Sequence, residues 1–282
     1  MSWVDFILNL AGLLLWLSWR SVGLDPFVET TPATLAGTLR RAEPHRLKRW
    51  HFLVALGGLL LLRAVLYWQV GAAADWTPNL HLHSVGRAIP FRSDCCWRML
   101  VFSLLSFGAT LGLFYLWLLL PSLVIEKSAE PDPVQKLVRM QLGRVDRWPW
   151  LLRLSLPLAV TFLVWYGVSG LLAGMTVIPP AVSKAQRFQQ AVVVGVGSYL
   201  SWEYLIGGVL ALHLVSSYVY LGSQPFWTWV ATLARNLLTP LRGVPLTLGK
   251  FDFTPLAGLA LVFFLGQLVE RGLSWLYTRV PF

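Results

Sequence analysis

Residues 224–240 read QPFWTWVATLARNLLTP, and they lie between two long apolar stretches of the chain. Within this segment, apolar side chains recur at helical spacing: Phe226, Trp229, Val230, Leu233 and Leu237. Pro225 suits the first turn of a helix, where a missing N–H loses no partner. Pro240 disfavours a helical backbone at Thr239. The segment therefore predicts a short amphipathic helix that begins at Pro225 and ends at Thr239.

The same unit occurs three times along the chain. Each copy has an apolar span, an X-Pro step, a basic amphipathic stretch and a second apolar span, with the steps at Asp25-Pro26, Asp132-Pro133 and Gln224-Pro225. A bilayer crossing needs roughly 20 apolar residues, and six stretches are long enough: 3–22, 51–71, 98–125, 150–174, 200–221 and 255–278. We expect an all-α membrane protein with six transmembrane helices in three helical hairpins, each with an amphipathic interfacial helix in its loop.

The repeat also predicts how the chain is divided. We expect a first hairpin module, a connector outside the cytoplasm, a middle hairpin, a second connector and a C-terminal hairpin module, at residues 1–71, 72–97, 98–178, 179–199 and 200–282. In the middle loop Asp132 can cap a helix that begins at Pro133, with its apolar stripe continuing to Trp148. In the first loop the corresponding helix is expected to begin at Thr31-Pro32. Five glycines are expected to let helix backbones approach closely: Gly57, Gly58, Gly207, Gly208 and Gly258.

The composition supports a membrane location. Of 282 residues, 56% are hydrophobic and only 13% are charged, about half the usual share for a soluble domain. Many of the 15 Trp residues fall near span ends, where amphipathic rings meet lipid headgroups. The net charge of +10 lies mostly in short loops, which indicates attraction to anionic lipid rather than to nucleic acid.

The distribution of positive charge predicts the orientation. Fifteen of the 23 Lys and Arg residues lie in or beside the three hairpin loops. Because cytoplasmic loops carry the Lys and Arg excess, we expect the hairpin loops in the cytoplasm and both termini outside.

Charged residues within the spans are costly and call for partners. Asp5 begins the first span and Arg63 lies late in the second, while Glu203 and Arg271 hold the matching places in the last hairpin. In an antiparallel hairpin the start of one helix is level with the end of the other. We therefore expect the pairs Asp5–Arg63 and Glu203–Arg271, with the alternative that each arginine extends alone to the headgroups.

Several other polar residues are candidate ligands for a metal or a cofactor. His81 and His83, followed by Asp94, Cys95 and Cys96, offer metal-binding side chains, but their spacing matches no compact zinc motif. A lone His213 within a span leaves open a subunit that binds haem or quinone. The two cysteines are adjacent and provide no disulfide framework. We expect neither a metal site nor a cofactor.

The last eighty residues resemble a YggT-type membrane module. That family carries an Asn-Pro-like step, a Pro-x-Arg stretch with a further Pro, and an Asp-x-Ser/Thr-Pro motif before its closing helix. The matching positions here are Pro225, Pro240, Arg242, Pro245, Asp252, Thr254 and Pro255. Gln224 replaces the usual Asn, and this chain has three hairpins where family members commonly have two. The first hairpin resembles the family only weakly, and the middle one hardly at all.

The resemblance implies a non-enzymatic scaffold, assembly or organisation factor in the bacterial inner membrane. From the residues themselves, we expect Arg242 to hold lipid phosphate or to pair with Asp252, and Pro255 to begin the last span. The expected partners are membrane lipids and other membrane proteins, with no nucleic acid. The alternative is a channel or transporter with a pathway between hairpins near the kinking residues Pro121 and Pro157.

Overall fold

The computed structural model describes most of the chain. The described residues are 3–21, 48–74, 76–82, 87–125, 133–219, 222, 224–241, 243, 247–248 and 251–279. They belong to two compact units, Met1–Leu80 with Pro90–Leu111 and His81–Ile89 with Gly112–Phe282. The amphipathic helix expected at Thr31-Pro32 lies outside the described residues.

The chain is an all-α membrane protein by the length and composition of its helices. Five segments of the described chain are long and apolar enough to cross a membrane: Arg49–Gly71, Cys96–Val124, Trp150–Gly174, Lys184–Tyr218 and Thr254–Leu276. The first expected span corresponds to α1 (Trp3–Ser21), which is not among the five. Its 19 residues include Asp5, Asn9 and Arg20, which lower its hydropathy.

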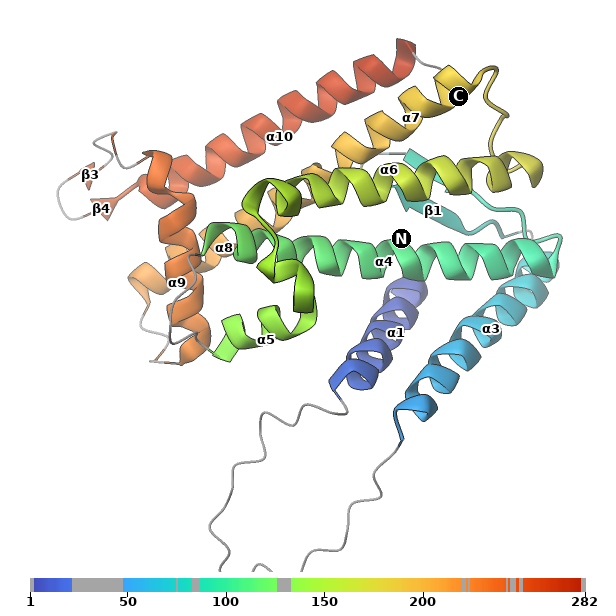
Figure 1. Cartoon of the computed structure of the whole chain (residues 1–282), viewed down its shortest axis with the longest axis horizontal. Helices are drawn as coiled ribbons and strands as arrows, with labels where there is room; N and C mark the ends of the chain where they lie inside the picture. Colours follow the sequence, from blue (N-terminus) through green and yellow to red (C-terminus); the bar gives the residue numbers. More distant parts are fainter. Residues whose placement is uncertain are drawn as a thin grey trace, which may run out of the picture. The chain divides into compact units, whose positions relative to one another are not determined.

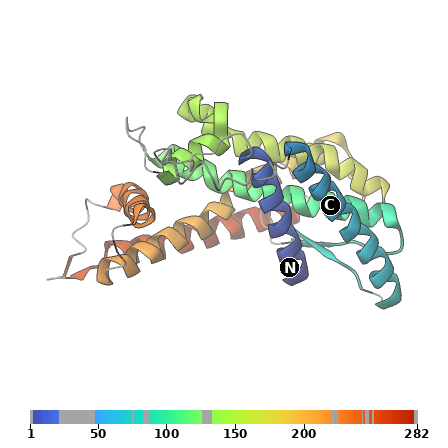
Figure 2. The ribbon, with the colours of Figure 1, turned by 90° about the horizontal axis from the view of Figure 1, so that it is seen from below.

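Unit 1 contains α1, α3 (Arg49–Ala74) and the first part of α4 (Cys96–Val124). Helices α1 and α3 lie side by side (Figure 1), and the view from below agrees (Figure 2). Their contact with α4 is close at Gly12, where an added Cβ would lie 2.9 Å from the Phe107 ring. Phe91, Met99 and Phe102 are almost completely buried in this unit.

Unit 2 contains the last part of α4 and the remaining helices. These are α5 (Pro133–Leu142), the 3-10 helix η1 (Gly143–Arg147), α6 (Trp150–Gly174), α7 (Lys184–Gly197), η2 (Ser198–Leu200), α8 (Ser201–Tyr218), α9 (Pro225–Leu237), η3 (Thr239–Leu241) and α10 (Thr254–Arg279). Helix α6 packs against α7, and α8 packs against both α9 and α10. A central cluster joins α8 to α9 through Val209, Leu210, Val230, Leu233, Ala234 and Leu238.

The described part of the chain contains four short strands, which depart from the all-helical expectation. β1 (Asn79–Leu82) and β2 (Arg87–Pro90) form one two-stranded sheet within the expected connector at 72–97. β3 (Thr247–Leu248) and β4 (Phe251–Asp252) form an antiparallel pair before α10. Strands this short carry too few residues for an alternating pattern to stand out, so hydrophobic periodicity does not predict them.

The amphipathic helices in the last two loops begin where the sequence predicts. α9 begins at Pro225, ends at Leu237 and buries Val230 and Leu233. α5 begins at Pro133 and buries Val138 and Leu142. The predicted apolar stripe of α5 is only partly buried, because Leu137 and Trp148 are exposed.

The expected connector at 179–199 is helical for most of its length, because Lys184–Gly197 form helix α7. Ser183 caps this helix: its side chain accepts a hydrogen bond from the Gln186 N–H, at 3.1 Å. The Gln186 side chain in turn accepts from the Val182 N–H at 2.7 Å. These bonds satisfy donors at the start of a helix, and with η2 and α8 the helix forms one long apolar segment.

Within the part of the chain that the structure describes, only two of the five glycines lie in close contact with another segment, and in both the neighbour is a side chain rather than a backbone. At Gly207 an added Cβ would lie 3.1 Å from Phe263, and at Gly258 it would lie 2.5 Å from Leu238. Gly57, Gly58 and Gly208 have no such neighbour among the described residues. Their sequence pattern does not distinguish a face that packs on another helix from one that is open.

Candidate functional site

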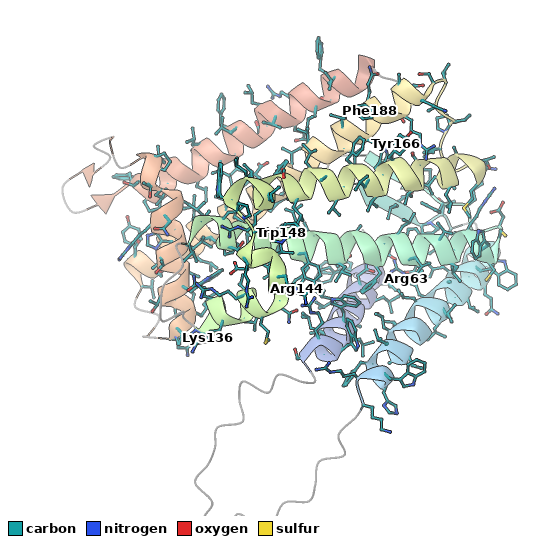
Figure 3. All side chains as sticks on the ribbon, in the orientation of Figure 1. Arg63, Lys136, Arg144, Trp148, Tyr166 and Phe188 are labelled. Carbon is teal, nitrogen blue, oxygen red and sulfur yellow. The ribbon has the colours of Figure 1, made fainter. Side chains whose placement is uncertain are left out.

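A buried arginine organises the interior of unit 1. Arg63 of α3 is 2% exposed, and Figure 3 shows its position beside α1. Its Nη2 donates to Asp5 Oδ1 at 2.7 Å and to Ser106 Oγ at 3.0 Å. Its Nη1 donates to Asn9 Oδ1 at 2.7 Å. The structure therefore brings together the expected pair Asp5–Arg63 and surrounds it with polar groups of α1 and α4.

Further contacts close this network. The Tyr67 hydroxyl donates to Asp5 Oδ1 at 2.6 Å, and Asn9 Nδ2 donates to Ser106 Oγ at 3.0 Å. The Arg63 guanidinium carbon also lies 5.1 Å from the centre of the Phe102 ring, a cation–π distance. We call Asp5, Asn9, Arg63, Tyr67 and Ser106 the Arg63 network.

Helical periodicity explains why these residues converge. Each helix contributes side chains four residues apart: Asp5 and Asn9 on α1, Arg63 and Tyr67 on α3, and Phe102 and Ser106 on α4. Residues at i and i+4 share one helix face. A search for polar partners four residues from Asp5 and Arg63 would have found Asn9 and Tyr67.

The Arg63 network can hold helices together. The ionised partners are almost completely buried, with side-chain exposures of 1% for Arg63 and 5% for Asp5. Removing either charge would leave the other uncompensated at high cost. The network can therefore fix the rotation and depth of α1 against α3 and α4, and Arg63 does not extend alone to the headgroups.

The second expected pair is not formed. Among the ion pairs of the described residues, none joins Glu203 to Arg271. The Glu203 carboxylate instead lies against Gly266 of α10, where an added Cβ would be 1.9 Å from Oε2. Five residues turn a helix by about 140° beyond one full turn, so Arg271 faces away from this contact and is exposed. Arg271 also lies five residues, or about 7.5 Å, further along α10 than Gly266, so the alignment of the repeats misplaces this pair in both depth and rotation.

Four of the seven family-like residues lie at or next to helix boundaries. Pro225 begins α9, and Pro240 lies within η3. Thr254 is the first residue of α10, followed by the buried Pro255, close to the expected start of the last span. Arg242 and Pro245 lie outside the described residues. Asp252 pairs through its backbone register with Thr247, while its side chain lies outside the description.

The two described amphipathic helices meet near the end of α4. α5 packs against α9, and both lie beside the end of α4 (Figure 1). Two side chains bind the terminal carbonyl groups of α4: Arg153 donates to the Ser122 carbonyl, and Asn236 Nδ2 donates to the Val124 carbonyl at 3.2 Å. Arg153 also lies 3.8 Å from Asp146 Oδ1. We call Pro133–Arg147 and Pro225–Leu237 together the α5–α9 platform.

The platform presents aromatic and basic side chains on its surface. Phe226 is 41% exposed and Trp148, directly after η1, is 44% exposed. Lys136, Arg144 and Arg147 are exposed as well, and Figure 3 shows Lys136, Arg144 and Trp148 along α5 and η1. Exposed rings and cations on an amphipathic helix suit an interface between membrane and water.

A second arginine site was not anticipated from the sequence. Arg187 of α7 donates through Nε to Ser169 Oγ at 3.0 Å and through Nη2 to the Tyr166 carbonyl. Its guanidinium carbon lies 4.6 Å from the centre of the Tyr166 ring. Figure 3 shows Tyr166 and Phe188 where α6 and α7 meet. The sequence places Arg187 in an expected connector, where a partner on a neighbouring helix is not predicted.

The remaining candidate metal ligands lie partly outside the described residues. His81 lies in β1, but its side chain is outside the description. His83 lies entirely outside the described residues. Asp94 is bound by Arg98, with 2.9 Å between carboxylate and guanidinium. Cys95 and Cys96 are free thiols. Within the described ranges, no three His, Cys, Asp or Glu side chains gather as metal ligands.

Comparisons with known proteins add no relative. No protein-family model matches the sequence, and neither a curated protein nor a solved structure matches it.

Proposed function

We propose that this chain is a non-enzymatic membrane scaffold of YggT type, which docks other membrane proteins and anionic lipid through the α5–α9 platform. The observation that carries this proposal is the packing of two amphipathic helices on each other with basic and aromatic side chains left exposed. Such a surface joins lipid contact to protein contact, because its rings and cations suit both headgroups and acidic partners.

The proposal includes a location and an arrangement. We place the protein in a bacterial inner membrane as six transmembrane helices, with α1 as the sixth and the platform on the cytoplasmic side. The Arg63 network supports a membrane position for α1, since it neutralises Asp5 within the helix group. The YggT assignment rests on the order of Pro225, Pro240, Arg242, Asp252 and Pro255.

A channel or transporter is the alternative. It requires a hydrated path lined by polar groups. Pro121 borders a cavity with room for about one water molecule, and Pro157 is buried within α6. These features favour docking over conduction. Solute flux into liposomes that contain the purified protein, absent from empty liposomes, would support the alternative.

The test compares two exposed cations. Arg144 lies on the platform and Lys184 lies at the start of α7. The full chain is purified in mild detergent, and the membrane proteins that accompany it are quantified for wild type, Arg144→Glu and Lys184→Glu. We expect Arg144→Glu to lose a defined set of partners that Lys184→Glu retains. Equal recovery in all three preparations would contradict docking through the platform.

A further inference from the structure

A small cavity lies inside the α5–α9 platform. It is lined by residues from the end of α4, from α5, η1 and α9: Pro121, Ser122, Ile125, Gln135, Val138, Arg139, Asp146 and Trp229. It has room for about one water molecule, which is also about the size of one oxygen atom of a larger anion. All of these residues belong to unit 2.

Two buried donors at this cavity have no hydrogen-bond partner within the described part of the chain. They are Nη2 of Arg139 and Nε1 of Trp229. The Arg guanidinium and the Trp indole are donors only, so neither can satisfy the other. A buried donor without an acceptor is costly. The cavity therefore suits a ligand that supplies an acceptor oxygen.

The charges around the cavity define the ligand further. Asp146 lines the cavity, but Arg153 lies 3.8 Å from its Oδ1. Arg153 is itself buried, and its Nε is a third donor without a partner among the described residues. The two guanidinium groups outweigh the single carboxylate by one positive charge. An anionic oxygen ligand is therefore favoured over a neutral one.

We propose that the cavity binds one phosphate oxygen of an anionic phospholipid headgroup, held by Arg139 Nη2 and Trp229 Nε1. This proposal rests on the proposed function, which places α5 and α9 at the membrane surface. Arg139 forms a charge-assisted hydrogen bond to the phosphate, and Trp229 adds a neutral donor on the opposite helix. A bound headgroup then bridges α5 and α9 and couples the platform to the lipid.

The experiment uses the full chain purified in detergent and tests binding of phosphatidylglycerol by native mass spectrometry, with phosphatidylcholine as the uncharged comparison. Measurements are made at about 0.5 M salt, where attraction between exposed charges is screened. The variants are Arg139→Gln, Trp229→Phe and the matched control Lys136→Gln, an exposed cation on α5 that does not line the cavity. Circular dichroism and gel filtration establish that each variant is folded.

We expect Arg139→Gln to weaken phosphatidylglycerol binding about tenfold, as the loss of a charged hydrogen bond implies. Trp229→Phe should weaken it severalfold, although the net charge is unchanged, and Lys136→Gln should bind as wild type does. Equal losses in Arg139→Gln and Lys136→Gln, or unchanged binding in Trp229→Phe, would overturn the site. Either result would indicate surface attraction alone.

Two further measurements distinguish lipid phosphate from free phosphate and distinguish the cavity proposal from the scaffold proposal. We expect that inorganic phosphate at millimolar concentration does not displace phosphatidylglycerol. If phosphate displaces it, and phosphatidylglycerol and phosphatidylcholine bind equally well, the site binds free phosphate and the proposed lipid site is overturned. Partner recovery is measured on the same variants. If the variants do not show the expected differences in phosphatidylglycerol binding but partner proteins are still recovered, only the cavity proposal is contradicted. If the variants show those differences but no partner proteins are recovered, only the scaffold proposal is contradicted.

Discussion

Arg63 of α3 and Asp5 of α1 form a buried ion pair, with 2.7 Å between Nη2 and Oδ1. Two charges that are separated by 58 positions in sequence thus neutralise each other inside one unit. Asn9 and Ser106 accept from the same guanidinium, so the pair is oriented by neutral groups from two helices. The arrangement makes the stability of unit 1 depend on a few polar contacts, which mutation can test.

Breaking this pair should destabilise the protein strongly. Arg63→Met leaves Asp5 buried and unpaired, and a cost of about 3–5 kcal/mol is expected. Asp5→Asn should also be destabilising, while the double variant should cost less than the sum of the two because no lone charge remains. Unfolding of the full chain by denaturing detergent, followed by circular dichroism, measures the four stabilities. Additive costs would show that the two residues are not coupled.

Two glycines of α3 offer a matched test of close packing. An added Cβ at Gly71 would lie 2.4 Å from Ser93 Cβ, whereas Gly58 has no neighbour within 4 Å among the described residues. Gly71→Ala should cost about 1–3 kcal/mol because the neighbouring segment must move. Gly58→Ala should be neutral or stabilising by up to about 1 kcal/mol, since alanine favours the helix.

The measurement is the same denaturing-detergent titration, applied to both glycine variants and wild type. A loss of stability in Gly58→Ala as large as that in Gly71→Ala would contradict the packing that the structure assigns to these positions.

The sequence predicted those features that depend on local chain length and composition. Five of the six expected spans follow from the length of their apolar runs, and the start of α9 follows from hydrophobic periodicity and from Pro225. The pair Asp5–Arg63 was predicted because, in an antiparallel hairpin, the start of the first helix lies at the same depth as the end of the second. These inferences need only the depth of a residue along its helix.

Features that depend on the rotation of one helix against another were not predicted. Glu203 lies against Gly266 rather than Arg271, because the alignment of the repeats fixes neither the register of two helices to within one turn nor the face that a residue occupies. Ser106 joins the Arg63 network from a helix that the hairpin argument did not consider. The start of α7 depends instead on a local signal, because Ser183 and Gln186 form a capping pair that is visible in the sequence.

The cap of α7 can be tested at one atom. Ser183→Ala removes the acceptor for the Gln186 N–H and should lower stability by about 1 kcal/mol. Ser183→Asp keeps an acceptor at the same position and should retain the stability of wild type. Hydrogen exchange at residues 184–188 reports fraying of the first turn directly. Slow exchange in Ser183→Ala, equal to that of wild type, would show that the cap contributes nothing to this turn.

Arg187 should hold α7 against α6 through geometry that lysine cannot copy. Its guanidinium donates to Ser169 Oγ and to the Tyr166 carbonyl while it lies over the Tyr166 ring. Arg187→Gln should cost about 1–3 kcal/mol, because the Tyr166 ring and two acceptors lose their partner. Arg187→Lys should recover only part of this, since a single ammonium cannot form the planar fork.

The matched control for Arg187 is Lys184→Gln, which removes an exposed cation from the first turn of the same helix. It should leave stability within about 0.5 kcal/mol of wild type. Thermal unfolding in detergent gives the order of the three variants. If Arg187→Lys were as stable as wild type, a positive charge alone would account for the stabilisation, and the geometry of the guanidinium hydrogen bonds would contribute nothing. The expected order, with Lys between Arg and Gln, requires both the charge and the shape of the guanidinium.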